Sequence, residues 1–369
     1  MNIIIFFVIL LVLVIIHECG HFFSAKKFGI RVDEFGFGFP PKLFGIKKGE
    51  TEYSFNLLPI GGFVKIFGEN PDETSISGPD SARSFVNKPK WQQAIVLFAG
   101  VFANFLLAWV LFSVGFISGI PTSVGNEPHG YAIENSNLVI VSVLSDSPAE
   151  RAGLMSGNRI VRLQSDDDVI MKENLNPITL KEFIISHPNT EINIDYLKSH
   201  LDEMVKTTTL TPAKNNENGT PTIGIAMDQI GTLKLPILKA FWEGLKLDWY
   251  MTKGTAVGFF TLIKSGLMGE GDLSSVTGPV GMVGIVGDAS QFGFTYLLSF
   301  AALISINLAV INLIPFPALD GGRLLFLLIE KIKGSRLNPK FANTANMVGF
   351  AILLIFMLVV TYKDIVRLF

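Results

Sequence analysis

Four long runs of apolar residues dominate the pattern along the chain, at 3–23, 94–118, 294–315 and 345–362. Each run is long enough to cross a hydrocarbon core of about 30 Å as a helix. No basic stretch precedes the first run and no small-residue cleavage site follows it, so we expect a retained span and not a signal peptide. The pattern predicts a polytopic α-helical membrane protein with about four spans.

A β-rich segment is expected at 31–67, between the first two runs. Aromatic and β-branched residues fill 31–39, 43–46, 52–58 and 63–67, and glycines and prolines separate them. The segment is too apolar for an ordinary soluble loop. Either it dips into the membrane beside a cavity, or it packs on the cytoplasmic ends of the spans.

Residues 128–225 have the short strands, turn residues and balanced charge of a soluble domain. Strands are expected at 139–144 and 159–163, with a short helix starting near Ser147 between them. The stretch 235–268 places leucines and tryptophans at helical spacing and lysines on another face. It predicts an amphipathic helix, which either lies on the membrane surface or packs on the soluble domain.

The basic residues predict an orientation. The loop 323–342 carries five basic residues against one acidic residue, and further basic residues follow the first span. The positive-inside rule therefore places 26–91 and 323–342 in the cytoplasm, and 120–290 with both termini outside.

The composition supports an integral membrane protein and narrows its chemistry. Of the 369 residues, 49% are hydrophobic and only 17% are charged. The net charge of -2 gives no reason to expect a nucleic-acid partner. The single cysteine, Cys19, excludes an internal disulfide. It lies two residues from each of two histidines and points off their shared face, so we expect a small packed side chain.

The first apolar run contains the sequence His17-Glu18-Cys19-Gly20-His21. On a helix, His17 and His21 lie one above the other and can hold zinc, while Glu18 can act as general base on a zinc-bound water. Ionisable groups are expensive in hydrocarbon and indicate function there. The alternative, a motif that arises by chance, is rare within an apolar run.

A zinc site needs a third protein ligand. The three remaining histidines fall in the segment predicted outside, so the ligand must be a carboxylate at membrane depth. Asp320 fits, because Pro315 and Pro317 break the third span just before it and Gly321-Gly322 follow it. Two histidines and one carboxylate leave a fourth position open for water. The alternative is that Asp320 caps a helix at the membrane surface.

Further motifs extend along nearly the whole chain. They are Phe35-Gly36-Phe37-Gly38, Gly49-Glu50-Thr51-Glu52-Tyr53, Pro59-Ile60-Gly61-Gly62-Phe63-Val64-Lys65, Lys88-Pro89-Lys90-Trp91, Ala99-Gly100, Asn104-Phe105-Leu106-Leu107-Ala108, Gly278-Pro279-Val280-Gly281 and the stretch from Asn312 to Gly322. With the histidine motif, they make the chain resemble the site-2 protease family of intramembrane zinc metalloproteases, in particular its bacterial RseP-like branch.

The resemblance implies zinc ligation by His17, His21 and Asp320, with Glu18 as the catalytic base. It implies that Asn312 and Asn307 lie near the substrate. It also implies a membrane-inserted β-hairpin around 53–67. An exposed edge of that hairpin, including Gly61 and Gly62, is expected to bind an unwound substrate strand by β-augmentation.

The resemblance also implies a domain order and a function. The order is a protease core in two parts, 1–119 and 289–369, with a PDZ domain outside at 128–225 and the amphipathic helix at 235–268. The expected activity is site-2 cleavage of single-span membrane proteins, such as anti-sigma factors already trimmed by a site-1 protease. The expected location is the bacterial inner membrane, in contact with lipid, with the active site toward the cytoplasm.

Some positions depart from the family pattern. Val101 replaces a usual proline, Arg323 replaces a frequent histidine, and Gly157-Asn158 replaces Gly-Asp. The space at 120–235 fits one PDZ domain, whereas related proteins often have two. Two other functions stay open. A catalytically inactive membrane scaffold would not need Glu18, and a metal transporter is expected to show more intramembrane polar residues or an inverted repeat.

Overall fold

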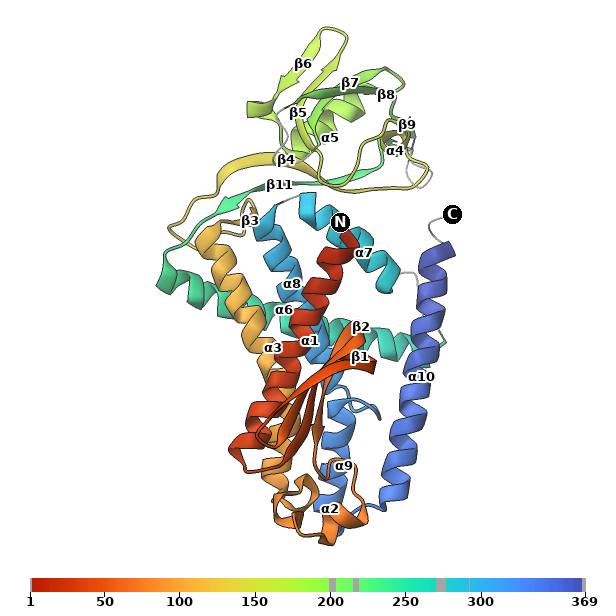
Figure 1. Ribbon diagram of the computed structural model, residues 1–369. Helices are drawn as coiled ribbons and strands as arrows, with labels where there is room; N and C mark the ends of the chain where they lie inside the picture. The colour runs from red at the N-terminus through yellow and green to blue at the C-terminus, as the bar shows by residue number, and fades with distance from the viewer. Residues whose placement is uncertain (1, 199–203, 215–218, 270–276, 292, 367–369) are drawn as a thin grey trace. The chain divides into compact units, whose positions relative to one another are not determined.

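The computed structural model describes residues 2–198, 204–214, 219–269, 277–291 and 293–366 (Figure 1). The chain divides into two compact units. The first unit comprises Met1–Leu111, Glu243–Gly284 and Ala301–Phe369, and the second comprises Phe112–Trp242 and Ile285–Phe300. Each unit is described by itself.

Among the described residues, four helices are long and apolar enough to cross a membrane. They are α1 (Asn2–Lys27), α3 (Lys90–Ser118), α8 (Phe294–Leu313) and α10 (Pro339–Val366). They coincide with the four apolar runs of the sequence, and the chain is an integral membrane protein with a β-sheet component. Shorter or less apolar helices of the first unit are α2 (Glu73–Ser77), η1 (Ser81–Arg83), η2 (Phe85–Asn87) and α9 (Asp320–Lys333). Helices α6 (Ile237–Leu267) and α7 (Pro279–Gln291) contain residues of both units.

The sequence-based expectations for α6 and α9 had different outcomes. The helix expected at 235–268 is present as α6, and its place on the membrane surface stays a prediction. The segment 323–342 connects α8 to α10, as expected of a loop between spans, but much of it is helical, because α9 extends to Lys333. Leu324 and Leu327 of α9 pack against a buried apolar cluster, and Gly334 ends the helix with a left-handed φ of 73°. The sequence did not predict α7.

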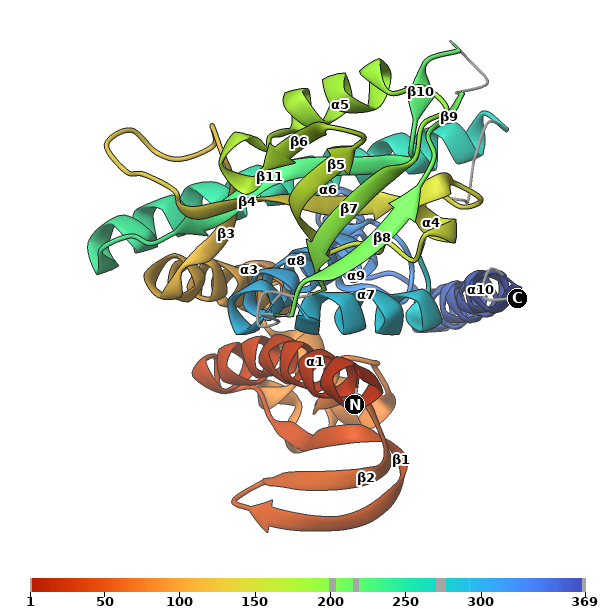
Figure 2. The same ribbon diagram turned by 90° about the horizontal axis from the view of Figure 1, so that it is seen from above.

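The β-segment is more elaborate than a simple hairpin. Strands β1 (Val32–Lys48) and β2 (Thr51–Ile66) each contribute two pairing segments to one sheet, whose curvature Figure 2 shows. Phe35 pairs with both Tyr53 and Val64, so the segment around Phe35 lies inside the sheet. The segment around Val64 lies at an edge and contacts α1. The four strand segments expected within 31–67 are confirmed, but the order in which they pair side by side was not predicted.

Helices α1 and α3 approach each other closely through glycines. A Cβ atom built on Gly20 would lie 2.2 Å from the backbone oxygen of Ala99, and one on Gly100 would lie 2.3 Å from Nε2 of His21. Neither position has room for a side chain. Small residues allow membrane helices to pack at short distance, and here they bring α3 directly against the histidine face of α1.

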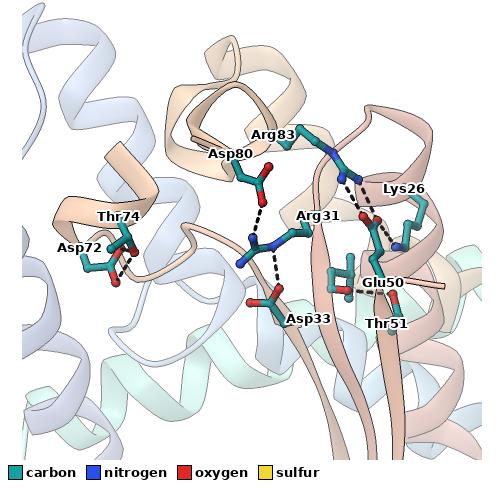
Figure 3. A network of polar contacts seen from close by, with 10 residues as sticks. Lys26, Arg31, Asp33, Glu50, Thr51, Asp72, Thr74, Asp80 and Arg83 are labelled. Carbon is teal, nitrogen blue, oxygen red and sulfur yellow. Dashed lines mark hydrogen bonds and ion pairs between the residues drawn. The ribbon is translucent and has the colours of Figure 1, made fainter. Parts of the chain in front are cut away.

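One cluster of ion pairs joins the end of α1 to the sheet, and a second joins the start of β1 to a turn that follows the sheet. Figure 3 shows Glu50 between Lys26 and Arg83, with contacts of 2.5 Å and 2.7 Å. Arg31 likewise bonds two carboxylates, Asp33 at 2.8 Å and Asp80 at 2.6 Å, and it stacks on the ring of Phe67. Charge-assisted hydrogen bonds of this kind hold the loops in register with the helix.

The Glu50 contacts predict a pH-dependent stability. Hydrogen bonds from Arg83 and then Lys26 lower the pKa of Glu50 from 4.5 to about 2. The stabilisation is therefore fully present above pH 4.5, the ordinary value, and is lost as the pH falls toward 2. Because these side chains are partly exposed, we expect Glu50→Gln to reduce stability by about 1 kcal/mol at neutral pH.

This difference is measured by thermal unfolding of purified protein at several pH values. Wild type and Glu50→Gln should differ at pH 7 and converge in strong acid. A difference that grows as the pH falls would contradict the assignment.

The second unit is built on a seven-stranded antiparallel sheet with the order β3-β11-β4-β5-β7-β8, in which β6 pairs with β5. Its elements are β3 (Ile120–Ser123), β4 (Glu134–Val143), α4 (Pro148–Arg151), β5 (Arg159–Ser165), β6 (Asp168–Met171), η3 (Lys172–Asn174), α5 (Pro177–Ser186), β7 (Ile192–Leu197), β8 (Lys206–Leu210), β9 (Ala213–Lys214), β10 (Pro221–Thr222) and β11 (Ile225–Leu233). Residues of α5 share one buried cluster with β4, β5 and β7. The strands expected at 139–144 and 159–163 and the helix beginning after Ser147 are confirmed.

Candidate metal centre

His17, His21 and Asp320 converge on one point. His17 and His21 lie one turn apart on α1 and are 6% and 7% exposed. Oδ2 of Asp320 lies 3.1 Å from Nε2 of His17 and 3.3 Å from Nε2 of His21, and the two nitrogens are 3.2 Å apart. Among the described residues, this cluster has the side chains and spacing that can hold a metal ion.

The geometry of the three atoms fits a tetrahedral metal. A zinc ion with bonds of about 2.0–2.1 Å holds its ligand atoms about 3.3–3.4 Å apart. Buried Oδ2 of Asp320 has no hydrogen-bond partner, although both histidine nitrogens lie within 3.3 Å. Three ligand atoms therefore face a common centre, and the Asp320 oxygen among them is left without a hydrogen-bond partner, which is an arrangement that a cation would stabilise.

A neighbouring carbonyl determines which nitrogen of His21 is available. Nδ1 of His21 lies 2.8 Å from the backbone oxygen of Val96. A carbonyl can only accept, so Nδ1 carries the proton and Nε2 keeps its lone pair. Metal-bound histidines are commonly oriented in this way by a hydrogen bond to the other ring nitrogen.

A tight turn places Asp320 at the first residue of α9. The chain leaves α8 after Leu313, and Ala318 adopts a left-handed φ of 79°. The Ala318 N–H donates to Oδ1 of Asn346 on α10, at 3.2 Å. A Cβ on Gly322 would lie 2.2 Å from the oxygen of Phe316, so the turn requires glycine there. Strained backbone held by its surroundings is typical of functional sites.

Glu18 and Asn312 line a cavity of about 360 Å³ beside the three converging side chains. The backbone N–H of Val64 interacts with the Glu18 carboxylate, and a Cβ on Gly62 would lie 3.7 Å from Cγ of Glu18. The edge segment of β2 thus runs past Glu18. Of the four other expected site residues, Asn312 lines this cavity, Gly62 lies near Glu18, and Asn307 and Gly61 are not among the lining residues.

Other residues at or near the cavity were not assigned a role by the sequence analysis. Arg323 and Glu69 form an ion pair, and both line the cavity. Gly100, Asn104 and Asn346 support the converging side chains from α3 and α10. The signal available for Asn104 was its position as a lone amide within an apolar run, and for Arg323 it was the departure from the family pattern.

Comparison with known proteins agrees with this arrangement. The sequence profile of Peptidase family M50 matches residues 5–356. A Clostridium perfringens protein, inferred to be a zinc metalloprotease, is 36% identical over 363 residues, covering 96% of this chain and 95% of the relative. The zinc metalloprotease RasP of Geobacillus kaustophilus is 28% identical and covers 100% and 98% of the two chains. The regulator of sigma-W protease RasP of Bacillus subtilis is 29% identical and covers 100% and 99%.

The apolar helices and these matches define a membrane metalloprotease. The chain belongs to peptidase family M50, so the predicted resemblance to the site-2 proteases is confirmed. The names of the relatives agree with the predicted zinc cofactor.

Proposed function

We propose that the chain is a zinc-dependent intramembrane endopeptidase that cuts single-span membrane proteins. The ligands are His17, His21 and Asp320, and the general base is Glu18. The observation that carries the proposal is the triangle of buried ligand atoms, 3.1–3.3 Å on each side, next to a cavity that Glu18 lines. A transporter or an inactive scaffold would have no use for this base beside the ligands.

When bound, zinc polarises the scissile carbonyl and lowers the pKa of a bound water toward ~7. Glu18 takes a proton from that water and delivers it to the leaving amine. Asn312, on the lining of the same cavity, donates its amide to the substrate backbone.

A substrate helix hides its peptide bonds and must unwind before cleavage. The β2 segment around Gly62 and Val64 lies at a sheet edge and contacts Glu18. An unwound substrate strand adds to such an edge through main-chain hydrogen bonds, and its scissile bond then lies close to the base. Exposed Leu43, Phe44 and Ile46 on the same sheet support insertion of this sheet into the membrane.

The orientation follows from the positive-inside rule. We propose that Lys48 and Ser335 face the cytoplasm and that Lys214, in the second unit, faces outside. In a Cys19→Ala background, cysteines at positions 48 and 335 should be shielded from membrane-impermeant thiol reagents in intact bacterial cells, whereas a cysteine at position 214 should label. Each cysteine should label after the membrane is permeabilised. The reverse pattern in intact cells would overturn the orientation.

The sheet of the second unit, covered by α5, is proposed to be a single PDZ domain that filters substrates by size. Along the chain it follows α3, a candidate span, and precedes α6, which we propose lies on the membrane surface. One relative is named as a regulator of sigma-W, and we propose trimmed anti-sigma factors as the substrate class. Excluding bulky substrates penalises wrong partners without needing to bind right ones.

Cleavage of matched single-span substrates tests this function. The purified protein should cut a substrate whose outer domain has been trimmed and reject its full-length form. Deleting 128–225 should leave cleavage of the trimmed form intact and permit cleavage of the full-length form. A folded, zinc-loaded deletion variant that cuts neither form would instead make the domain a recruiting module.

A further inference from the structure

One face of α3 packs against both predicted metal-binding histidines. Val96, Gly100 and Asn104 lie four residues apart and so share that face. The Val96 carbonyl accepts a hydrogen bond from Nδ1 of His21, and the Asn104 side chain contacts His17. Between them, Gly100 leaves room for both rings. Each imidazole therefore has its own partner on α3, separated by two helical turns.

The Asn104 amide is buried and half satisfied. The residue is 0% exposed, its Nδ2 lies 3.4 Å from Nδ1 of His17, and its Oδ1 is buried without a hydrogen-bond partner. If Nδ2 donates to Nδ1, the neutral ring must carry its proton on Nε2. That proton would point at Asp320 and His21, where a metal ligand needs a lone pair.

Turning the amide by half a rotation exchanges its oxygen and nitrogen. The exchange breaks no hydrogen bond of Oδ1, because Oδ1 has none. Oδ1 then accepts a hydrogen bond from Nδ1–H of His17, as the Val96 carbonyl does from His21. Both Nε2 atoms are then unprotonated, and their lone pairs point to the same place.

We propose that Asn104 is a positioning residue that fixes the tautomer and orientation of His17 for metal binding. It acts as a hydrogen-bond acceptor from the neighbouring helix. The inference rests on the proposed zinc site and assigns it an outer partner that the histidine motif does not reveal. Such partners of metal-bound histidines typically contribute 10–100-fold in metal affinity.

Zinc affinity of the full-length purified protein, measured by competition with a chelator, tests the proposal. Asn104→Leu, of similar size without an acceptor, should weaken zinc binding about 10–100-fold. Asn104→Asp should bind zinc close to wild type, because a carboxylate can only accept. The visible spectrum of the cobalt-substituted protein should be preserved in Asn104→Asp and altered in Asn104→Leu.

Ser305→Ala is the matched control. Its hydroxyl donates to the backbone oxygen of Asn104 at 2.8 Å, so the change perturbs the same helix contact without touching the amide. Zinc affinity of this variant should stay close to wild type.

The outcomes separate this proposal from the zinc site itself. If wild type binds no zinc, the proposed function fails. If wild type binds zinc and Asn104→Leu binds it equally well, only the role of Asn104 fails. A folded Asn104→Asp variant that loses zinc affinity also contradicts the proposal, because a side chain that can only accept would then fail to replace the amide.

Discussion

Replacing Glu18 with glutamine is expected to leave the zinc content at the wild-type level and to lower the rate of peptide-bond cleavage at least ~10²-fold. Glu18 lines the cavity but is not one of the three converging ligand atoms, so metal binding does not need it. A glutamine has nearly the same shape and cannot take a proton from water. The measurement is cleavage of a single-span substrate together with metal analysis of the same preparation.

Cys19→Ala is the control for this experiment. Cys19 is adjacent in sequence, partly buried, and packed against an apolar cluster of the first unit. Its replacement should retain both zinc and cleavage, so that loss in Glu18→Gln is specific to the carboxylate. Near-normal turnover of Glu18→Gln would rule out Glu18 as the base.

Replacing Asp320 with alanine is expected to remove most of the zinc and to abolish cleavage. Two imidazole nitrogens 3.2 Å apart would remain, and catalytic zinc sites have three protein ligands. His17→Ala and His21→Ala should have the same effect for the same reason. Metal analysis should show about one zinc per chain in wild type and little in each variant.

A second buried carboxylate offers a matched control. Asp248 on α6 is fully buried, whereas the Asp320 side chain is 16% exposed, and neither oxygen of Asp248 has a hydrogen-bond partner. It does not belong to the three-residue cluster, so Asp248→Asn should retain zinc. Full zinc occupancy in Asp320→Ala would contradict the assignment of Asp320 as the third ligand.

Much of the candidate site was predictable for two reasons: the histidine motif lies within one helix, and few other carboxylates could supply the third ligand. The spacing of His17 and His21 is a property of one helix, and Glu18 lies between them. Asp320 followed by elimination, because few carboxylates lie in an apolar context. The structure brings His17, His21 and Asp320 together, and their role as zinc ligands stays a prediction.

The supporting residues were not predictable, because they depend on how separate helices meet. Asn104 reaches His17 only because Gly100 lets α3 approach α1, and a single sequence does not state which faces pair. Asn346 accepts a hydrogen bond from the Ala318 N–H. The left-handed backbone of Ala318, which places this group, could not be predicted from the sequence.

The fold shows the same division between local and long-range information. Strand segments within 31–67 were visible from their composition and punctuation, but the double pairing of Phe35 depends on contacts between distant residues. The helix within the connecting segment 323–342 was not predicted. The charges of this segment were considered without the apolar positions of Leu324 and Leu327, which share a face of α9.

Cleavage as a function of bound zinc tests the central claim most directly. The purified protein is stripped with a chelator, reloaded with increasing zinc, and assayed on a trimmed single-span substrate at each step. We predict that cleavage is absent in the stripped protein, rises in proportion to bound zinc, and reaches its maximum at about one zinc per chain in wild type but not in Asp320→Ala. Full cleavage by the zinc-free protein, or equal recovery in Asp320→Ala, would contradict the account.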